Sequence, residues 1–231
     1  MGKIIVFLGP VGVGKSTTIK TLKTYLDTVN VKTHTFFIKA FHGPSFVLWY
    51  IVLSIVTRRR RTKLQNVAPW YLLGRYHPKL GEGLTKISLL LDTFIAIPVK
   101  VLVLKLLSKC KLVILCEECV LGGVIDYLYS FRRNKSVLAY VSMEILLSLY
   151  YSLRADTIVY LFATTEDLKN RWHSRGYGDP QLPYVIYQQI SFLVFQKYEK
   201  SQIFAIDTSG KRPKDVLLDL SRLLRLLSLH K

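Results

Sequence analysis

The stretch that decides the fold is Gly9-Pro10-Val11-Gly12-Val13-Gly14-Lys15-Ser16-Thr17. It fits the pattern G-x-x-x-x-G-K-[ST], and it lies between an apolar run at residues 4–8 and a helical pattern at residues 16–28. Glycines let the backbone curl so that successive N–H groups point at a phosphate, and the positive end of the following helix adds to the attraction. The stretch therefore predicts a phosphate-binding loop.

This loop predicts a site for Mg·ATP, with the backbone of residues 9–17 cradling the phosphates. Lys15 should reach the β- and γ-phosphates, and we expect it to act in catalysis. The hydroxyl of Ser16 should bind Mg²⁺, which usually takes one or two protein carboxylates besides the phosphates. ATP and Mg²⁺ are therefore the expected cofactors.

The apolar runs outside the loop predict the rest of the fold. Short buried strands are expected at residues 4–8, 33–38, 112–116, 157–162 and 203–206. Helical patterns occupy residues 16–28, 86–108, 136–153, 165–174, 182–200 and 214–229. This alternation predicts an α/β fold, a three-layer P-loop NTPase sandwich around a five-stranded parallel sheet.

Composition narrows the choice of partner. The chain has 231 residues without a clear shift in composition, so we expect one domain over residues 1–231. A net charge of +18 requires a polyanionic partner, and nucleotides, nucleic acid or an anionic membrane would all serve. Nucleic acid is the least favoured because no RNA-binding motif accompanies the charge. The three clustered cysteines and the lack of a secretory signal indicate the cytosol.

Two later segments carry a resemblance to a known family. Residues 156–176, DTIVYLFATTEDLKNRWHSRG, resemble the fourth strand and basic lid of thymidylate kinases and related nucleoside monophosphate kinases. The resemblance implies a lid at about residues 170–180, where Arg171 and Arg175 share a helix face and meet the transferred phosphate. Residues 204–210, FAIDTSG, resemble the family's fifth strand and adenine loop, which implies nucleotide contacts from Asp207 and Ser209.

The third strand departs from that family at its end. Where thymidylate kinases have Asp-Arg-Tyr, this chain has Glu117, Glu118 and Cys119. Glu117 keeps the acidic charge at the carboxyl end of the strand, so we expect it to bind Mg²⁺ through water or to position the acceptor. Glu118 stands where the family has the arginine that contacts the acceptor phosphate.

The resemblance also implies acceptor contacts elsewhere. Residues 39–44, KAFHGP, stand where the family has Arg-Glu-Pro-Gly, and Asp92-Thr93 stands where it has Asp-Arg. We therefore expect Lys39, His42 and Asp92 on the acceptor side. The acceptor stays open between a nucleoside monophosphate, a nucleoside and a lipid-linked alcohol.

A hydrophobic, helical insertion at about residues 44–80 does not fit a soluble kinase. Residues 46–56, FVLWYIVLSIV, precede four consecutive arginines at 58–61. Eleven residues are too few to span a bilayer, which takes about 20, but an apolar anchor beside a basic cluster suits a peripheral contact with anionic lipid. Residues 87–107 are long enough, yet Asp92, Lys100 and Lys105 disfavour spanning. The alternative is a helix pair packed on itself or across a homodimer.

The leading hypothesis is an ATP-dependent phosphotransferase resembling thymidylate kinase, which moves the γ-phosphoryl group to a nucleoside monophosphate or another small acceptor. The second hypothesis, from a different class, is a membrane-peripheral ATP-binding protein in which the altered acceptor motifs reflect lost catalysis.

Overall fold

The computed structural model describes residues 2–56, 77–132, 136–174, 182–199 and 201–226. Side chains in the last of these segments are described as far as residue 220.

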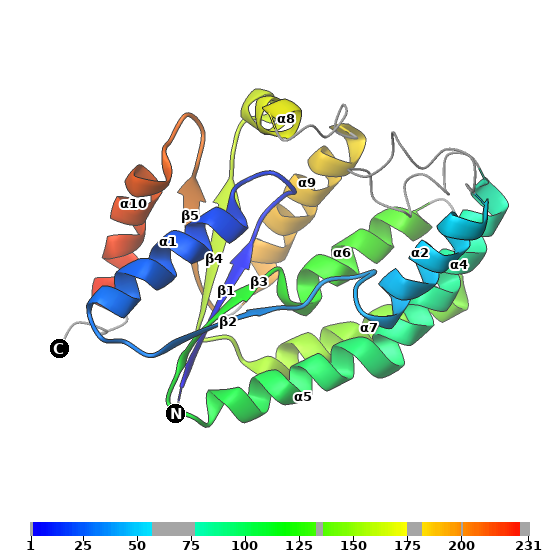
Figure 1. Ribbon diagram of the computed structural model, residues 1–231, viewed down its shortest axis with the longest axis horizontal. Coiled ribbons are helices and arrows are strands. Elements are labelled where there is room, and N and C mark those ends of the chain that lie inside the picture. Colours follow the sequence, from blue (N-terminus) through cyan, green and yellow to red (C-terminus); the bar gives the residue numbers. More distant parts are fainter. Residues whose placement is uncertain (1, 57–76, 133–135, 175–181, 200, 227–231) are drawn as a thin grey trace.

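Five parallel strands form the centre of the molecule (Figure 1). They are β1 (Lys3–Leu8), β2 (Thr33–Phe37), β3 (Val113–Glu117), β4 (Thr157–Phe162) and β5 (Gln202–Asp207). Their order in the sheet is β2-β3-β1-β4-β5, with all neighbouring pairs parallel. The predicted five-stranded parallel sheet is confirmed, and each strand lies within one residue of its predicted bounds.

Helices cover both faces of this sheet (Figure 1). The first half of the chain contributes α1 (Lys15–Thr28), α2 (Pro44–Val56), α4 (Pro78–Leu91), the π-helical turn η2 (Asp92–Ala96) and α5 (Ile97–Ser108). The second half contributes α6 (Cys119–Phe131), α7 (Val137–Leu153), α8 (Thr165–Ser174), α9 (Leu182–Tyr198) and α10 (Pro213–Leu226). Helices α1 and α10 lie on one side of the sheet, and α5, α6 and α7 lie on the other.

Strand β1 shows how the three layers are held together. Successive side chains of a strand point to opposite faces. Ile5 and Phe7 accordingly pack with α1 and α10, whereas Ile4, Val6 and Leu8 pack with the helices of the opposite layer. All five side chains are buried, which explains why the strand is a continuous apolar run rather than an alternating one.

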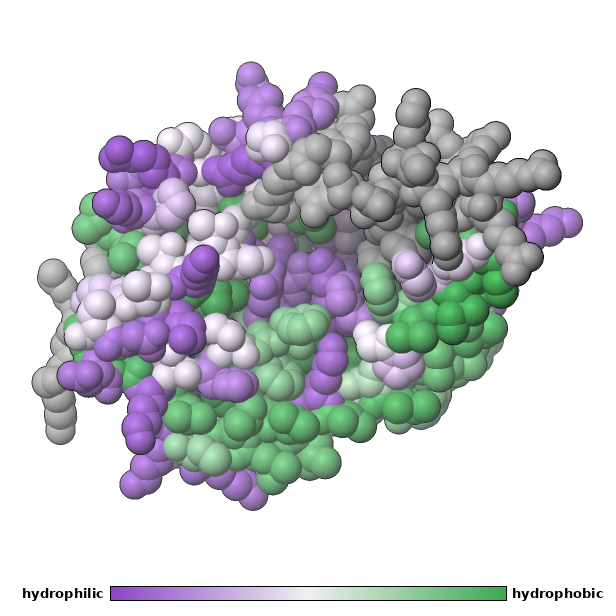
Figure 2. Space-filling model, in the orientation of Figure 1, coloured by the Kyte–Doolittle hydropathy of each residue, from purple (hydrophilic) through white to green (hydrophobic). Residues whose placement is uncertain are grey.

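Helices α4 and α5 join through η2 into one helix, Pro78–Ser108, whereas the sequence predicted a start only at residue 86. Among the described residues, this helix is long and apolar enough to cross a membrane by length and composition, and 44% of its most apolar window is buried in the protein. Pro98 lies inside this joined helix, two residues after the π-helical turn η2, where the regular pattern of α-helical hydrogen bonds is already interrupted. The outer side of the helix is apolar (Figure 2).

Helix α6 was not predicted. Its apolar start, Cys-Val-Leu-Gly-Gly-Val-Ile, continues the run of β3, and paired glycines weaken a helical pattern. The structure shows a use for one of them, because a Cβ on Gly123 would lie 3.3 Å from the backbone nitrogen of Ala40. The glycine lets α6 approach the segment that follows β2. Cys116 and Cys119 are free thiols buried in this part of the core.

Candidate active site

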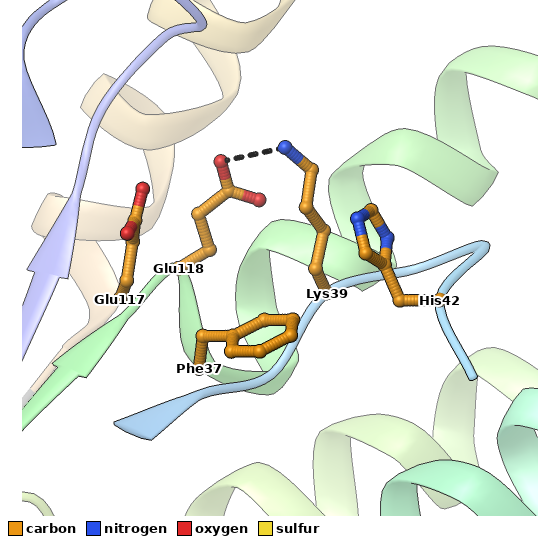
Figure 3. A pocket seen from close by; sticks show the side chains of 5 residues that line it. All are labelled: Phe37, Lys39, His42, Glu117 and Glu118. Atoms are coloured by element: carbon orange, nitrogen blue, oxygen red, sulfur yellow. Dashed lines mark hydrogen bonds and ion pairs between the residues drawn. The ribbon is translucent and has the colours of Figure 1, made fainter. Parts of the chain in front are cut away.

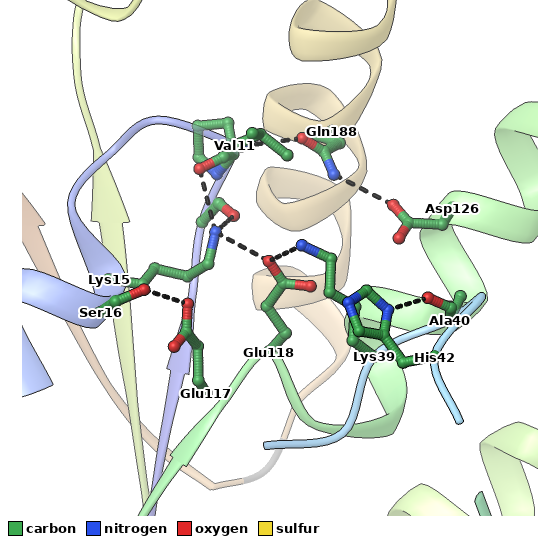
Figure 4. Close-up of polar contacts among 12 residues, drawn as sticks. Val11, Lys15, Ser16, Lys39, Ala40, His42, Glu117, Glu118, Asp126 and Gln188 are labelled. Carbon is green, nitrogen blue, oxygen red and sulfur yellow. Dashed lines mark hydrogen bonds and ion pairs between the residues drawn. The ribbon is translucent and has the colours of Figure 1, made fainter. Parts of the chain in front are cut away.

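The phosphate-binding loop connects β1 to α1, as predicted, and its lysine lies inside it (Figure 4). The Nζ atom of Lys15 donates hydrogen bonds to the carbonyl oxygens of Gly9 (2.8 Å) and Pro10 (3.1 Å). Lys15 is only 5% exposed. The side chain is therefore curled back under the loop, at the place where a β- or γ-phosphate would meet it.

A tryptophan from α8 covers the loop from outside. The indole Nε1 of Trp172 donates a hydrogen bond to the carbonyl oxygen of Val11 (3.1 Å). A Cβ on Gly12 would lie 2.4 Å from that same nitrogen, and Gly12 has a φ of +89°, a conformation that L side chains rarely adopt. The motif glycine is thus required both by its backbone and by the contact with Trp172.

Arg171 joins the loop to the end of β5. Its guanidinium donates to the carbonyl oxygen of Val13 (2.9 Å), to the Thr208 hydroxyl (3.1 Å) and to the Thr208 carbonyl oxygen. The same hydroxyl also donates to Val13 (3.1 Å). Arg171 therefore lies beside the phosphate loop, where it positions the backbone. The predicted second lid arginine, Arg175, lies outside the described residues.

The other predicted nucleotide contacts form a tight turn after β5. The backbone N–H and hydroxyl of Ser209 donate to Asp207 Oδ1 at 2.9 and 2.6 Å, and these bonds lower the pKa of that carboxyl. Ser209 also accepts a hydrogen bond from the N–H of Thr164 (2.9 Å). The turn is therefore fixed to the end of β4, and its contact with adenine stays a prediction.

Glu117 ends β3 next to the loop, as expected from its place in the sequence. The Ser16 hydroxyl donates a 2.7 Å hydrogen bond to its Oε1. A hydroxyl and a carboxylate in contact are the oxygen donors that Mg²⁺ accepts beside nucleotide phosphates. No cluster of three or more ligating side chains occurs in the described residues, but a metal that the phosphates also hold does not need one. Ser16 and Glu117 therefore supply oxygen donors that are suited to the expected Mg²⁺.

Glu118 was not predicted as a site residue, yet it lies at the centre of the site. One of its oxygens, Oε1, is 3.2 Å from Lys15 Nζ and 3.3 Å from Lys39 Nζ. Burial alone would raise the pKa of this carboxyl, but the charges and hydrogen bonds of the two lysines lower it to about 2. Glu118 also raises the pKa of Lys39. The carboxylate is therefore ionised and shared by two cations.

The backbone brings Glu118 to this position. Glu118 and Cys119 have φ angles of +62° and +52°, which is unusual for residues with side chains. Such conformations cost on the order of 1–3 kcal/mol each and are found at functional sites. The turn places Glu118 beneath the loop, while its N–H donates to the Phe7 carbonyl oxygen (2.9 Å).

A cavity of about 200 Å³ lies on the acceptor side (Figure 3), lined by Phe37, Lys39, His42, Glu117 and Glu118. The predicted Lys39 and His42 thus lie together beside Glu118. A ring nitrogen of His42 is 2.7 Å from the Ala40 carbonyl oxygen. Burial lowers the pKa of His42, so the ring is neutral at pH 7.

Asp92, expected on the acceptor side, does not line this cavity. It is completely buried, and its carboxylate accepts hydrogen bonds from the Phe41 N–H (2.8 Å), the Ser45 hydroxyl (2.6 Å) and the Tyr127 hydroxyl (2.6 Å). Burial raises the pKa of Asp92 although these bonds oppose the shift. Its observed contacts hold the segment that carries Lys39 and His42.

A third buried carboxylate, which the sequence did not indicate, supports the loop from α6. Asp126 accepts hydrogen bonds from the Tyr184 hydroxyl and from Gln188 Nε2 (3.1 Å). Gln188 Oε1 in turn accepts from the N–H of Val11 (3.0 Å), so the chain of contacts ends in the phosphate loop (Figure 4). Burial, followed by the charge of Glu118, raises the pKa of Asp126 to about 6.

This shift predicts a pH dependence of stability. Because the folded pKa is above the ordinary value of 3.8, protonated Asp126 stabilises the fold fully below about pH 4, and that contribution is lost as the pH rises through 6. We expect the free energy of unfolding of wild type, relative to Asp126→Asn, to fall by on the order of 3 kcal/mol between pH 4 and 7. Denaturant unfolding of both proteins measures it. A difference that does not change over this range would contradict the assignment.

Comparisons with known proteins are informative at the level of the fold. No protein-family model matches the chain, and no curated protein matches it significantly. A solved thymidylate kinase from Candida albicans is similar to it in structure, with a TM-score of 0.57 and 16% sequence identity. The similarity covers 100% of this chain and 94% of that one. The chain has a thymidylate kinase-like fold. This agrees with the order and direction of the strands and with a phosphate loop after the first of them.

Proposed function

We propose that the protein is an ATP-dependent phosphotransferase that transfers the γ-phosphoryl group of ATP to a small acceptor. The observation that carries the proposal is the grouping at the carboxyl edge of the sheet. There Lys15 lies within the phosphate loop, Ser16 contacts Glu117, and Glu118 joins Lys15 to the cavity that contains Lys39. The kinase-like fold supports it.

Catalysis in this arrangement is mainly electrostatic positioning. The backbone N–H groups of the loop and Lys15 would hold the β- and γ-phosphates and stabilise the charge that develops on the transferred group. Bound to the phosphates, Ser16 and Glu117, Mg²⁺ would supply further neutralisation of that charge. Glu118 and Lys39 would orient an acceptor in the adjoining cavity. Trp172 and Arg171 would stabilise the backbone conformation of the loop.

The test is transfer from γ-labelled ATP across a panel of nucleoside monophosphates, nucleosides and long-chain alcohols. Transfer to at least one of them is expected. ATP binding without transfer to any would contradict the proposal and favour the second hypothesis, an ATP-binding protein that has lost catalysis. One observation favours that alternative, because Glu118 stands where the related kinases have an arginine.

Replacing Glu117 with glutamine should weaken the use of Mg²⁺. The variant keeps a hydrogen-bond acceptor for Ser16, 2.7 Å away in the wild type, but removes the negative charge that favours a divalent cation. We expect transfer to fall about 100-fold at a fixed Mg²⁺ concentration, with partial recovery as Mg²⁺ is raised. Titration of activity with Mg²⁺ measures this. Wild-type rates with an unchanged Mg²⁺ requirement would exclude Glu117 from the metal site.

A further inference from the structure

Helix α2 presents an apolar surface. It contains no charged residue, and only Ser45 and Trp49 are buried in it. Its outward-facing large side chains are between 37 and 66% exposed: Phe46, Val47, Tyr50, Ile51, Ile55 and Val56. A surface helix of a globular protein ordinarily has polar residues on that side. The helix is thus suited to a partner that is itself apolar.

Helix α2 packs against α4 and η2, and the same surface continues along the outer side of α4, η2 and α5. The exposed apolar side chains follow one stripe: Leu80, Ile87, Phe94, Ile95, Val99, Leu102, Val103 and Leu106. In Figure 2 the hydrophobic colour runs without a break from α5 along the lower edge to α2 and α4. We call this surface the apolar face. Its extent marks it as an interaction site.

Lysines outnumber acidic residues along the helix that carries the apolar face. From residue 78 to residue 111 the chain has two acidic residues, of which Asp92 is buried and Glu82 pairs with Lys86 at 2.8 Å. Six lysines lie in the same stretch: Lys79, Lys86, Lys100, Lys105, Lys109 and Lys111. Lysines around an apolar helix face complement anionic lipid headgroups. A second copy of the chain would instead bring like charges together.

A row of aromatic rings connects the apolar face to the cavity. The His42 ring, in the cavity wall, lies 5.9 Å from the ring of Phe37 and 6.1 Å from that of Phe46, measured between centroids. Phe37 is 52% exposed, and Lys100 Nζ from α5 lies 4.6 Å above it. The acceptor side of the site thus opens next to the apolar face.

The charges in the cavity disfavour an acceptor that is itself a phosphate. Among the described residues that line the cavity, Lys39 is the one cation, and it is already paired with Glu118 at 3.3 Å, whereas a dianionic acceptor requires cations of its own. A neutral hydroxyl avoids this repulsion and can donate a hydrogen bond to a carboxylate.

We propose that the apolar face binds an anionic lipid bilayer and that the acceptor is a hydroxyl-bearing amphiphile resident in it, an inference that rests on the proposed function. The hydroxyl oxygen bonds to the γ-phosphorus of ATP, while the bond from that phosphorus to the bridging β–γ oxygen breaks. ADP leaves with that oxygen, the hydroxyl proton passes to water, and a lipid phosphomonoester remains in the membrane.

Binding is tested without catalysis, by flotation of the full chain with phosphatidylcholine vesicles that contain or lack phosphatidylglycerol. Binding to the anionic vesicles is expected, and the variant Val99→Glu/Leu102→Glu should lose it at least about tenfold. Leu218→Glu, a change at a 69% exposed leucine of α10, is the matched control and should bind as wild type. Circular dichroism confirms folding. The proposal would be overturned if the wild type did not bind the vesicles or if the α5 variant bound them equally well. It would also be overturned if the wild type were a dimer that dissociates in this variant.

Transfer is tested in the same vesicles, doped with a long-chain isoprenoid alcohol or a diacylglycerol, by following label from γ-labelled ATP into the lipid extract. Label in that extract, absent with Lys15→Ala although this variant still floats, is expected. Transfer only to a water-soluble nucleotide would overturn the acceptor class and leave the proposed function intact. If flotation succeeds but no acceptor of any kind is labelled, the proposed function fails, and the acceptor class with it, while the bilayer contact stands.

Discussion

Phosphoryl transfer should fall about 10³-fold when Lys15 is replaced with alanine, which is the effect expected from removing a buried charge that acts on the transferred group. Lys15 is 5% exposed and lies 2.8 and 3.1 Å from two carbonyl oxygens of the loop, so its amine is held inside the loop that would surround the phosphates. Single-turnover transfer from γ-labelled ATP measures the loss, and calorimetry measures the affinity for Mg·ATP.

The matched control for Lys15→Ala is Lys39→Ala. Both lysines pair with Glu118, at 3.2 and 3.3 Å, so either change leaves that carboxylate with one cation. Only Lys15→Ala should reduce transfer by weakening the binding of the triphosphate. Lys39→Ala should keep the affinity for Mg·ATP and weaken use of the acceptor. If both variants lose nucleotide affinity equally, the division into a nucleotide side and an acceptor side is wrong.

The second large effect concerns stability. Glu118→Gln should lower the free energy of unfolding at pH 7 by about 3 kcal/mol, because it leaves buried Lys15 without its counter-charge. The unpaired Lys39 contributes less to this loss of stability, since its side chain is 30% exposed and water can solvate its ammonium group. Denaturant unfolding measures the loss. The double variant Glu118→Gln/Lys39→Met should recover part of it.

The pH dependence gives an independent check on Glu118. Its folded pKa, about 2, is below the ordinary value of 4.5, so its contribution is fully present above pH 4.5 and is lost as the pH falls towards 2. Because the charge of Glu118 also raises the pKa of Asp126, the comparison is made in the Asp126→Asn background, where the difference in stability between Glu118 and Glu118→Gln should be constant above about pH 5 and shrink below it. A difference that grew as the pH fell would contradict the ion pairs.

The sequence was sufficient for the sheet and the loop because both depend on local patterns. A buried parallel strand is a short apolar run, and a phosphate loop is a fixed spacing of glycines before Lys15. Glu117 was predictable from its place at the carboxyl end of β3. Helix α6 could not be predicted because its first residues continue the strand's apolar run and its glycine pair opposes a helix. In the structure Gly123 lies close to Ala40, and Gly122 lies close to the side chain of Glu118.

Contacts between distant residues could not be predicted from one sequence. Gln188 meets the loop at Val11 across 177 residues, and Trp172 meets the same residue across 161. The sequence shows Glu118 only as the replacement of an arginine, whereas in the structure its carboxylate pairs with two lysines. A second acid directly after Glu117 was the available signal. Asp92 was expected on the acceptor side from the resemblance alone, and its burial and its bonds to Phe41 and Tyr127 could not be predicted from one sequence.

The shared carboxylate links the two halves of the site. Lys15 and Lys39 approach the same oxygen of Glu118, so a nucleotide that draws Lys15 towards its phosphates leaves that oxygen to Lys39 and to whatever lies beside it. Binding of a ligand on the nucleotide side thereby changes the electrostatic field on the acceptor side. Such coupling is reciprocal: if bound ATP changes the affinity of the protein for the acceptor by some factor, bound acceptor changes the affinity for ATP by the same factor. The two ligands should bind cooperatively, through an ammonium group that changes partners.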